Sequence, residues 1–159
     1  MSQNGPFSAT ADVNGDGLGD VFIGGAKDQS GVLYLQNQQG KFIKSTSQPW
    51  DLDRVSEDLG CLFFDADGDQ DLDLYVTSGG NEFKLGTNAL LDRLYVNDGK
   101  GNFKRDSRAL PSLKVSSQSV VCSDIDKDGD LDLFVGTRLV PGKYTFPADS
   151  YLLLNENGR

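Results

Sequence analysis

The chain has 159 residues, of which 37% are hydrophobic and 25% are charged, and its formal net charge is -9. This length suits one ordinary domain, and no run of 18 apolar residues predicts a membrane span. The acidic balance argues against a nucleic-acid partner, because phosphates require a basic face. The chain contains no histidine, which excludes Ser-His-Asp and Cys-His catalysis and the usual zinc sites.

The first predicted structural unit covers about residues 6–48. A weak strand, FSATA from Phe7, precedes an acidic loop, DVNGDGLGD, and the strand VFIGG follows from Val21. Another β-favouring run begins at Val32, and a Gly-containing turn that ends at Phe42 leads into KFIKS. Such turns between β-favouring runs are hairpin signals, so the unit predicts four antiparallel strands.

The same order of segments recurs twice more, at about residues 59–107 and 118–159. The strands GCLFF and SVVCS precede the loops DADGDQDLD and DIDKDGDLD, and these begin 53 and 59 residues after the preceding loop. The third unit lacks an outer strand. Periods of this size fit four-stranded β-propeller blades. We therefore expect an all-β chain, a single segment over residues 1–159 with about three blades, which is either a fragment of a propeller or one closed by oligomerisation.

The acidic loops are predicted calcium sites. Each places carboxylate or amide oxygens at positions 1, 3, 5 and 9, as a hard cation such as Ca²⁺ requires. Position 12 is apolar (Ile23, Val76, Val135), so the bidentate Glu of an EF-hand is missing and position 9 must close the site, with the position-7 carbonyl as a fifth ligand. An acidic turn without metal is the alternative, because Asp and Gly favour turns. The ligands expected for up to three structural Ca²⁺ ions are Asp12, Asn14, Asp16, Leu18, Asp20, Asp65, Asp67, Asp69, Asp71, Asp73, Asp124, Asp126, Asp128, Asp130 and Asp132.

The three loops are predicted to bind unequally. Asn14 leaves the first loop with one carboxylate fewer than the others. Gln70 occupies position 6 of the second loop, where a positive φ favours glycine. The third loop has Gly129 there, although Lys127 offsets part of its charge, so we expect the third loop to bind best.

A ligand-binding face is expected at the end opposite the acidic loops. The longer connections of the second and third units and the linker at 45–58 should meet there, and loop aromatics and arginines are common anchors of recognition. The candidates are Trp50, Phe83, Arg138, Tyr144 and Phe146. The alternative is that the aromatics pack against the rim or neighbouring blades. Asp92 and Arg93 are expected to form an ion pair, and Cys61 and Cys122 to be buried free thiols.

The loop pattern followed by a strand resembles the FG-GAP or VCBS repeats of integrin α-chain-type propellers. The segments LYVTSGGNEF, DRLYVNDGKGNF and VPGKYTFPADSYLLLNENG are also similar to large secreted repeat proteins of Bacteroidetes. The resemblance implies calcium loops in blade hairpins and a scaffold for adhesion or for binding a protein or glycan ligand. It also implies that the parent protein is extracellular or at the cell surface, although MSQNGPFSAT lacks the features of a signal peptide.

Two other functions remain open at this point. A propeller could belong to a polysaccharide lyase or hydrolase, for which Glu57, Asp58 and Glu82 are available acids, because glycosidases use two carboxylates. The absence of histidine and the use of most acids in the loops favour a chain that is not an enzyme. The chain could instead be a self-assembling module, in which a homo-oligomer closes the propeller.

Overall fold

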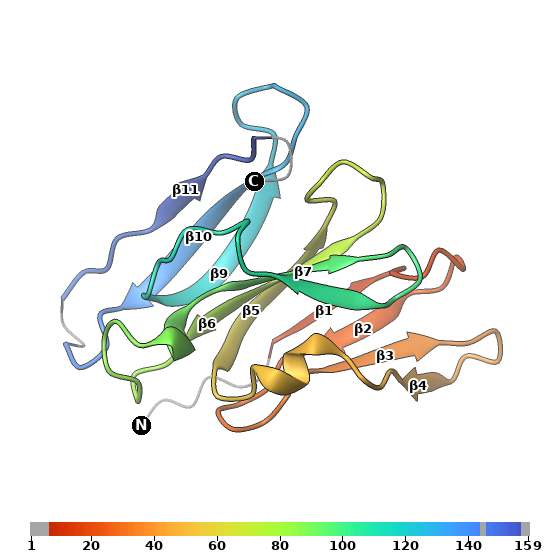
Figure 1. Cartoon of the computed structure of the whole chain (residues 1–159), viewed down its shortest axis with the longest axis horizontal. Helices are drawn as coiled ribbons and strands as arrows, with labels where there is room; N and C mark the ends of the chain where they lie inside the picture. Colours follow the sequence, from red (N-terminus) through yellow and green to blue (C-terminus); the bar gives the residue numbers. More distant parts are fainter. Residues whose placement is uncertain (1–6, 144–145, 157–159) are drawn as a thin grey trace.

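The computed structural model describes residues 7–143 and 146–156, and within these ranges it consists of three antiparallel sheets lying side by side (Figure 1). The strand orders are β1-β2-β3-β4, β5-β6-β7-β8 and β11-β10-β9, so consecutive strands are neighbours in every sheet. We call these sheets blades 1, 2 and 3. They are blades of an incomplete β-propeller, which confirms the predicted all-β fold.

The strands coincide closely with the predicted β-favouring runs. Blade 1 contains β1 Ser8–Ala11, β2 Asp20–Ile23, β3 Val32–Gln36 and β4 Phe42–Lys44. Blade 2 contains β5 Glu57–Phe64, β6 Asp73–Gly79, β7 Arg93–Asn97 and β8 Phe103–Asp106. Blade 3 contains β9 Ser116–Ser123, β10 Asp132–Leu139 and β11 Tyr151–Leu153. Two short 3-10 helices, η1 Pro49–Leu52 and η2 Asn88–Leu90, lie in connections. Within the described ranges no helix has the length and apolar character needed to cross a membrane.

The acidic loops all lie at the same end of the blades. Each loop joins the first and second strands of its blade, which pair directly before and after it. The first strands are the contact points between blades, because β5 lies against β1 on one side and β9 on the other. Since side chains alternate between the two faces of a sheet, each face of a central blade can bury apolar residues against a neighbour.

The linker between blades 1 and 2 inserts Trp50 into the core between them. Its indole lies 5.1 Å from the Phe22 ring and 5.5 Å from the rings of Tyr95 and Phe103, centroid to centroid. Only 3% of the Trp50 side chain is exposed. The linker does not stay at the far end of the blades, since the Gln48 amide donates to the Gly101 carbonyl (2.9 Å) in the β7–β8 turn. The prediction that Trp50 contributes to a ligand-binding face is therefore corrected.

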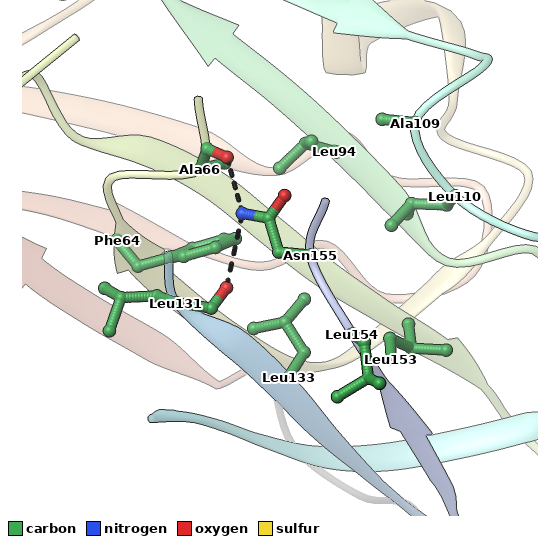
Figure 2. Close-up of a pocket in the computed structure, with 10 residues that line it drawn as sticks. All are labelled: Phe64, Ala66, Leu94, Ala109, Leu110, Leu131, Leu133, Leu153, Leu154 and Asn155. Atoms are coloured by element: carbon green, nitrogen blue, oxygen red, sulfur yellow. Dashed lines mark hydrogen bonds between the residues drawn. The ribbon is translucent and has the colours of Figure 1, made fainter. Parts of the chain in front are cut away.

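The core between blades 2 and 3 is less completely filled. The linker that follows β8 contributes Ala109 and Leu110 there, and no indole. These side chains, together with Phe64 and Leu94 of blade 2 and Leu133 of blade 3, surround an apolar cavity of about 40 Å³ (Figure 2). The smaller linker side chains account for this space, because packed interiors otherwise leave few voids.

A buried ion pair joins the connection-side ends of blades 1 and 2. Arg93 pairs with Asp58 (Nη2 to Oδ1, 2.5 Å), and both side chains are at most 5% exposed. The other Asp58 oxygen accepts the Gly25 N–H (2.7 Å) from blade 1. The expected partner of Arg93 was Asp92, and this is corrected. Asp92 instead accepts hydrogen bonds from the Tyr75 hydroxyl and the Ser78 N–H, and desolvation raises its pKa to about 6.

Candidate metal centre

The acidic loops share one pattern of local hydrogen bonds. In every loop the position-1 carboxylate accepts the N–H of position 4, at 2.7–2.8 Å. The position-5 carboxylate likewise accepts the N–H of position 7, at 2.9–3.0 Å. Side-chain-to-backbone bonds of this kind are typical of Asp-rich turns. These bonds fold the carboxylates of positions 1 and 5 back onto the backbone of each loop.

Two backbone positions in every loop take the left-handed conformation. At position 6, φ is 83° for Gly17, 73° for Gln70 and 102° for Gly129. At position 4, φ is 72° for Gly15, 81° for Gly68 and 67° for Lys127. Non-glycine residues pay a steric cost there. The sequence interpretation considered only position 6, so the strained residue of the third loop, Lys127, was missed as a backbone defect.

The position-9 aspartates, Asp20, Asp73 and Asp132, are fully buried and hold each loop to its own blade. One oxygen accepts the N–H of position 2, and the other accepts the N–H of Gln36, Asn97 or Asn155 at the end of the third strand. A carboxylate has about four acceptor sites. A position-9 side chain can therefore bind a cation in addition to accepting these N–H groups.

Carboxylate oxygens converge within two of the loops. One oxygen from each of Asp65, Asp67 and Asp73 lies within 4.8 Å of the others. The oxygens of Asp124, Asp126 and Asp128 meet the same limit. Because calcium binds oxygen at about 2.4 Å, ligands on one ion lie at most about 4.8 Å apart. The residues present therefore fit a calcium ion.

The first loop has the same bonding pattern as the other two. Asp12 accepts the N–H groups of Gly15 and Gly17 (2.8 and 2.7 Å), and the Asn14 amide oxygen accepts that of Asp16 (3.1 Å). Asp12, Asn14 and Asp16 hold the loop positions that Asp65, Asp67 and Asp69 hold in the second loop. Leu18, Asp71 and Asp130 stand at position 7, where the backbone carbonyl is the expected ligand.

Without a cation, the second loop is electrostatically unfavourable. Desolvation and the neighbouring Asp69 raise the pKa of Asp71 to about 6, and desolvation raises that of Asp73 to about 7. Asp71 Oδ1 is also buried without a hydrogen-bond partner. In the third loop, by contrast, the N–H groups of Asn155 and Ile125 lower the pKa of Asp132. Desolvation raises the pKa of Asp126 in that loop. A dication would relieve the excess negative charge of the second loop.

The family model described as the FG-GAP-like repeat matches residues 12–76 and 65–135. Each match begins at position 1 of one acidic loop and ends at position 12 of the next. The chain belongs to the FG-GAP-like repeat family. FG-GAP repeats are in general non-catalytic and are typical of extracellular proteins. No curated protein matches the chain.

The strained glutamine of the second FG-GAP-like loop offers a test of loop geometry. Gln70 is exposed, and only its backbone N–H takes part in the loop, donating to Asp65. Gln70→Gly should raise the free energy of unfolding by about 1 kcal/mol, because glycine adopts this φ without steric cost. Urea denaturation in excess EDTA measures the effect without contributions from metal.

Gln39→Gly is the matched control for this substitution. Gln39 is also exposed in a turn, but its φ is not positive, so glycine there should lower the stability through added unfolded-state entropy. A destabilised Gln70→Gly chain would contradict the assignment of strain to this residue.

Two asparagines tie the FG-GAP-like loops of blades 1 and 2 to the blade that follows. The Asn97 amide of blade 2 donates to the Leu72 carbonyl of its own loop (3.1 Å) and to the Val13 carbonyl of the blade 1 loop (2.8 Å). Asn155 of blade 3 donates to the Leu131 and Ala66 carbonyls in the same way (3.4 and 2.8 Å; Figure 2). We call Asn97 and Asn155 the latch asparagines. Their place at the end of the third strand, in VND and LNE, is a signal that could have identified them.

The far end of the blades holds only part of the predicted ligand face. Phe83 is partly buried with the Lys27 ammonium 5.5 Å from its ring centroid, whereas Phe146 is exposed, with Lys143 at the same distance. Arg138 is exposed on β10, and Tyr144 lies outside the described residues. A cavity of about 150 Å³ also opens at this end. Its lining, which the sequence did not indicate, includes Leu85, Val115, Leu139, Pro141, Pro147 and Tyr151.

Proposed function

We propose that this chain is a calcium-stabilised, FG-GAP-like binding module of an extracellular or cell-surface protein. The observation that supports calcium most directly is the convergence of three carboxylate oxygens within 4.8 Å in each of two repeated loops. The ligands are all oxygen, as a hard cation requires, and loop positions 1, 3, 5, 7 and 9 supply them. Magnesium would demand shorter distances and near-ideal octahedral geometry.

The proposed role of calcium is structural. The position-9 carboxylates already connect each loop to the end of a third strand, and in blades 2 and 3 a latch asparagine connects that strand end to the loop of the preceding blade. An ion bound inside the loop would therefore fix a hairpin that two strands and a neighbouring blade share. It would also offset the repulsion among carboxylates that raises the pKa of Asp71.

Calcium titration of the whole chain by calorimetry tests this proposal. We expect up to three sites with dissociation constants of about 10⁻⁴ to 10⁻³ M, typical of extracellular modules. At about 1 mM calcium, each site should then add about 0.4–1.4 kcal/mol to the free energy of unfolding. Asp124→Asn combined with Asp128→Asn should remove one site, and that site should be the tightest.

The control is Asp51→Asn, which removes an exposed acid of η1 that lies outside the loops. It should leave the calcium stoichiometry and affinities unchanged. Absence of binding heat, together with an unchanged melting temperature in EDTA, would show that the loops are acidic turns without a metal.

We place the ligand, a protein or a glycan, at the end opposite the loops, around the 150 Å³ cavity and the exposed Phe146. A catalytic role is not proposed. Asp58, one of the candidate acids, forms an ion pair with Arg93. Glu57 is buried, and desolvation and the neighbouring Glu82 raise the pKa of Glu57. A glycan and peptide array at fixed calcium tests the assignment. Turnover of any array compound would contradict it.

A further inference from the structure

One face of blade 3 is exposed although the equivalent faces of blades 1 and 2 are buried. Strand pairing and loop position identify the equivalent residues, which are Val13, Phe22 and Leu33 in blade 1, Ala66, Tyr75 and Leu94 in blade 2, and Ile125, Phe134 and Leu152 in blade 3. In blades 1 and 2 these side chains are at most 5% exposed, because the next blade covers them. In blade 3 they are 47–49% exposed. We call this side of a blade its trailing face.

The opposite side, the leading face, shows the reverse pattern. Val76 of blade 2 and Val135 of blade 3 are buried against the preceding blade. Their equivalent in blade 1, Ile23, is 37% exposed. Phe42 of blade 1 is 49% exposed, whereas its equivalent Phe103 is 8% exposed and packs against Trp50. The chain thus carries both halves of a blade interface, one at each end.

The hydrogen bonds of the latch follow the same order. A latch asparagine donates to the position-2 carbonyl of the preceding blade, Val13 for Asn97 and Ala66 for Asn155 (Figure 2). In blade 3 the position-2 carbonyl belongs to Ile125, and no following blade is described. In blade 1 the latch position is occupied by Gln36. Its backbone N–H donates to the position-9 aspartate of its own blade, Asp20, and the N–H groups of Asn97 and Asn155 donate to the position-9 aspartates of theirs. Gln36 also carries an amide donor.

We infer that the trailing face of blade 3 binds the leading face of blade 1 in a second copy of the chain. The proposed interface repeats the two blade interfaces that exist within the chain. Phe134 of one copy would pack against the apolar side chains around Ile23 of the other copy, and Gln36 would take the place of a latch asparagine. Its two halves differ, so association is head to tail and can close into a ring. Two copies give six blades, within the range of closed propellers. The inference is independent of the calcium proposal, because no proposed ligand takes part.

Light scattering of the 159-residue chain, at several concentrations and in saturating calcium, tests the interface. The expected mass is twice the 17.2 kDa of one chain. Phe134→Glu on the trailing face and Ile23→Glu on the leading face should each weaken self-association by at least about 100-fold, because either buries an unpaired charge. Leu52→Glu, which alters an exposed leucine of η1 on neither face, should have no effect.

Mixing the two face variants distinguishes this arrangement from others. Each variant retains one intact half, so the mixture should form a dimer through a single interface although each variant alone is monomeric. This complementation also shows that both variants are folded. Three outcomes would overturn the inference: an unsubstituted chain that is monomeric, Ile23→Glu chains that still dimerise, or a mixture that fails to associate.

Discussion

Replacing Trp50 by alanine should lower the free energy of unfolding by about 3–5 kcal/mol, the usual cost of deleting a buried aromatic side chain. The indole contacts three aromatic rings from three strands, Phe22 of β2, Tyr95 of β7 and Phe103 of β8. Its removal would leave a cavity between blades 1 and 2, whose walls can collapse only by moving whole sheets. Urea denaturation followed by far-UV circular dichroism measures the change.

The matched control for Trp50 lies two residues away in the same 3-10 helix. Leu52 is 89% exposed, so Leu52→Ala should change the stability by less than about 0.5 kcal/mol. Trp50→Phe should recover part of the loss, because a smaller ring still fills some of the space. Equal effects of Trp50→Ala and Leu52→Ala would contradict the placement of the indole in the core.

The second large effect is expected from Arg93→Met. This substitution leaves the Asp58 carboxylate buried with only the Gly25 N–H as a donor, and breaking a buried ion pair in this way typically costs about 3–5 kcal/mol. The loss should be concentrated at the contact between blades 1 and 2, because Asp58 connects Arg93 of blade 2 to the backbone of blade 1. Thermal denaturation near neutral pH is the measurement.

A second ion pair in the chain provides the comparison. Arg105 pairs with Asp53 nearer the surface, where the arginine is 36% exposed and the aspartate 12% exposed, and ion pairs that reach solvent contribute about 0–1 kcal/mol. Arg105→Met should therefore have a small effect. Combining Arg93→Met with Asp58→Leu should restore part of the lost stability, because an apolar pair can replace a buried ion pair, although the Gly25 N–H then loses its acceptor. If both arginine variants lose the same small amount, the buried pair is unimportant for stability.

The sequence predicted the blades because their signals are local. Strands, Gly turns and acidic loops each depend on neighbouring residues, and the positive φ expected at position 6 is present even for Gln70. Trp50 could not be placed in the same way. Its aromatic neighbours lie far from it in the chain, and they come together only when two blades pack. From the sequence alone, Trp50 therefore resembled an exposed loop aromatic that binds a ligand.

The partner of Arg93 was misassigned for a related reason. Asp92 is adjacent in sequence, but adjacent residues of a strand point to opposite faces of the sheet. Arg93 faces blade 1 and meets Asp58, while Asp92 faces the other way and meets Tyr75. The sequence did not reveal that position 4 of the third loop is strained. Two loops have glycine there and the third has Lys127, and the positive φ of Lys127 shows that the third loop adopts the same conformation.

The burial of blade 2 on both sides has a consequence for how the chain opens. In repeat architectures stability is roughly the sum of each unit and its contacts with its neighbours, and among the described residues of one unassociated chain blade 2 is the blade with a neighbour on both sides. Every residue of β6 is buried, whereas no residue of β1 is. Amides of β6 should be the last to exchange with solvent, and the outer blades should fray first. Calcium in the blade 3 loop would then act where the fold is weakest, at the end of the blade opposite the cavity that we assign to the ligand.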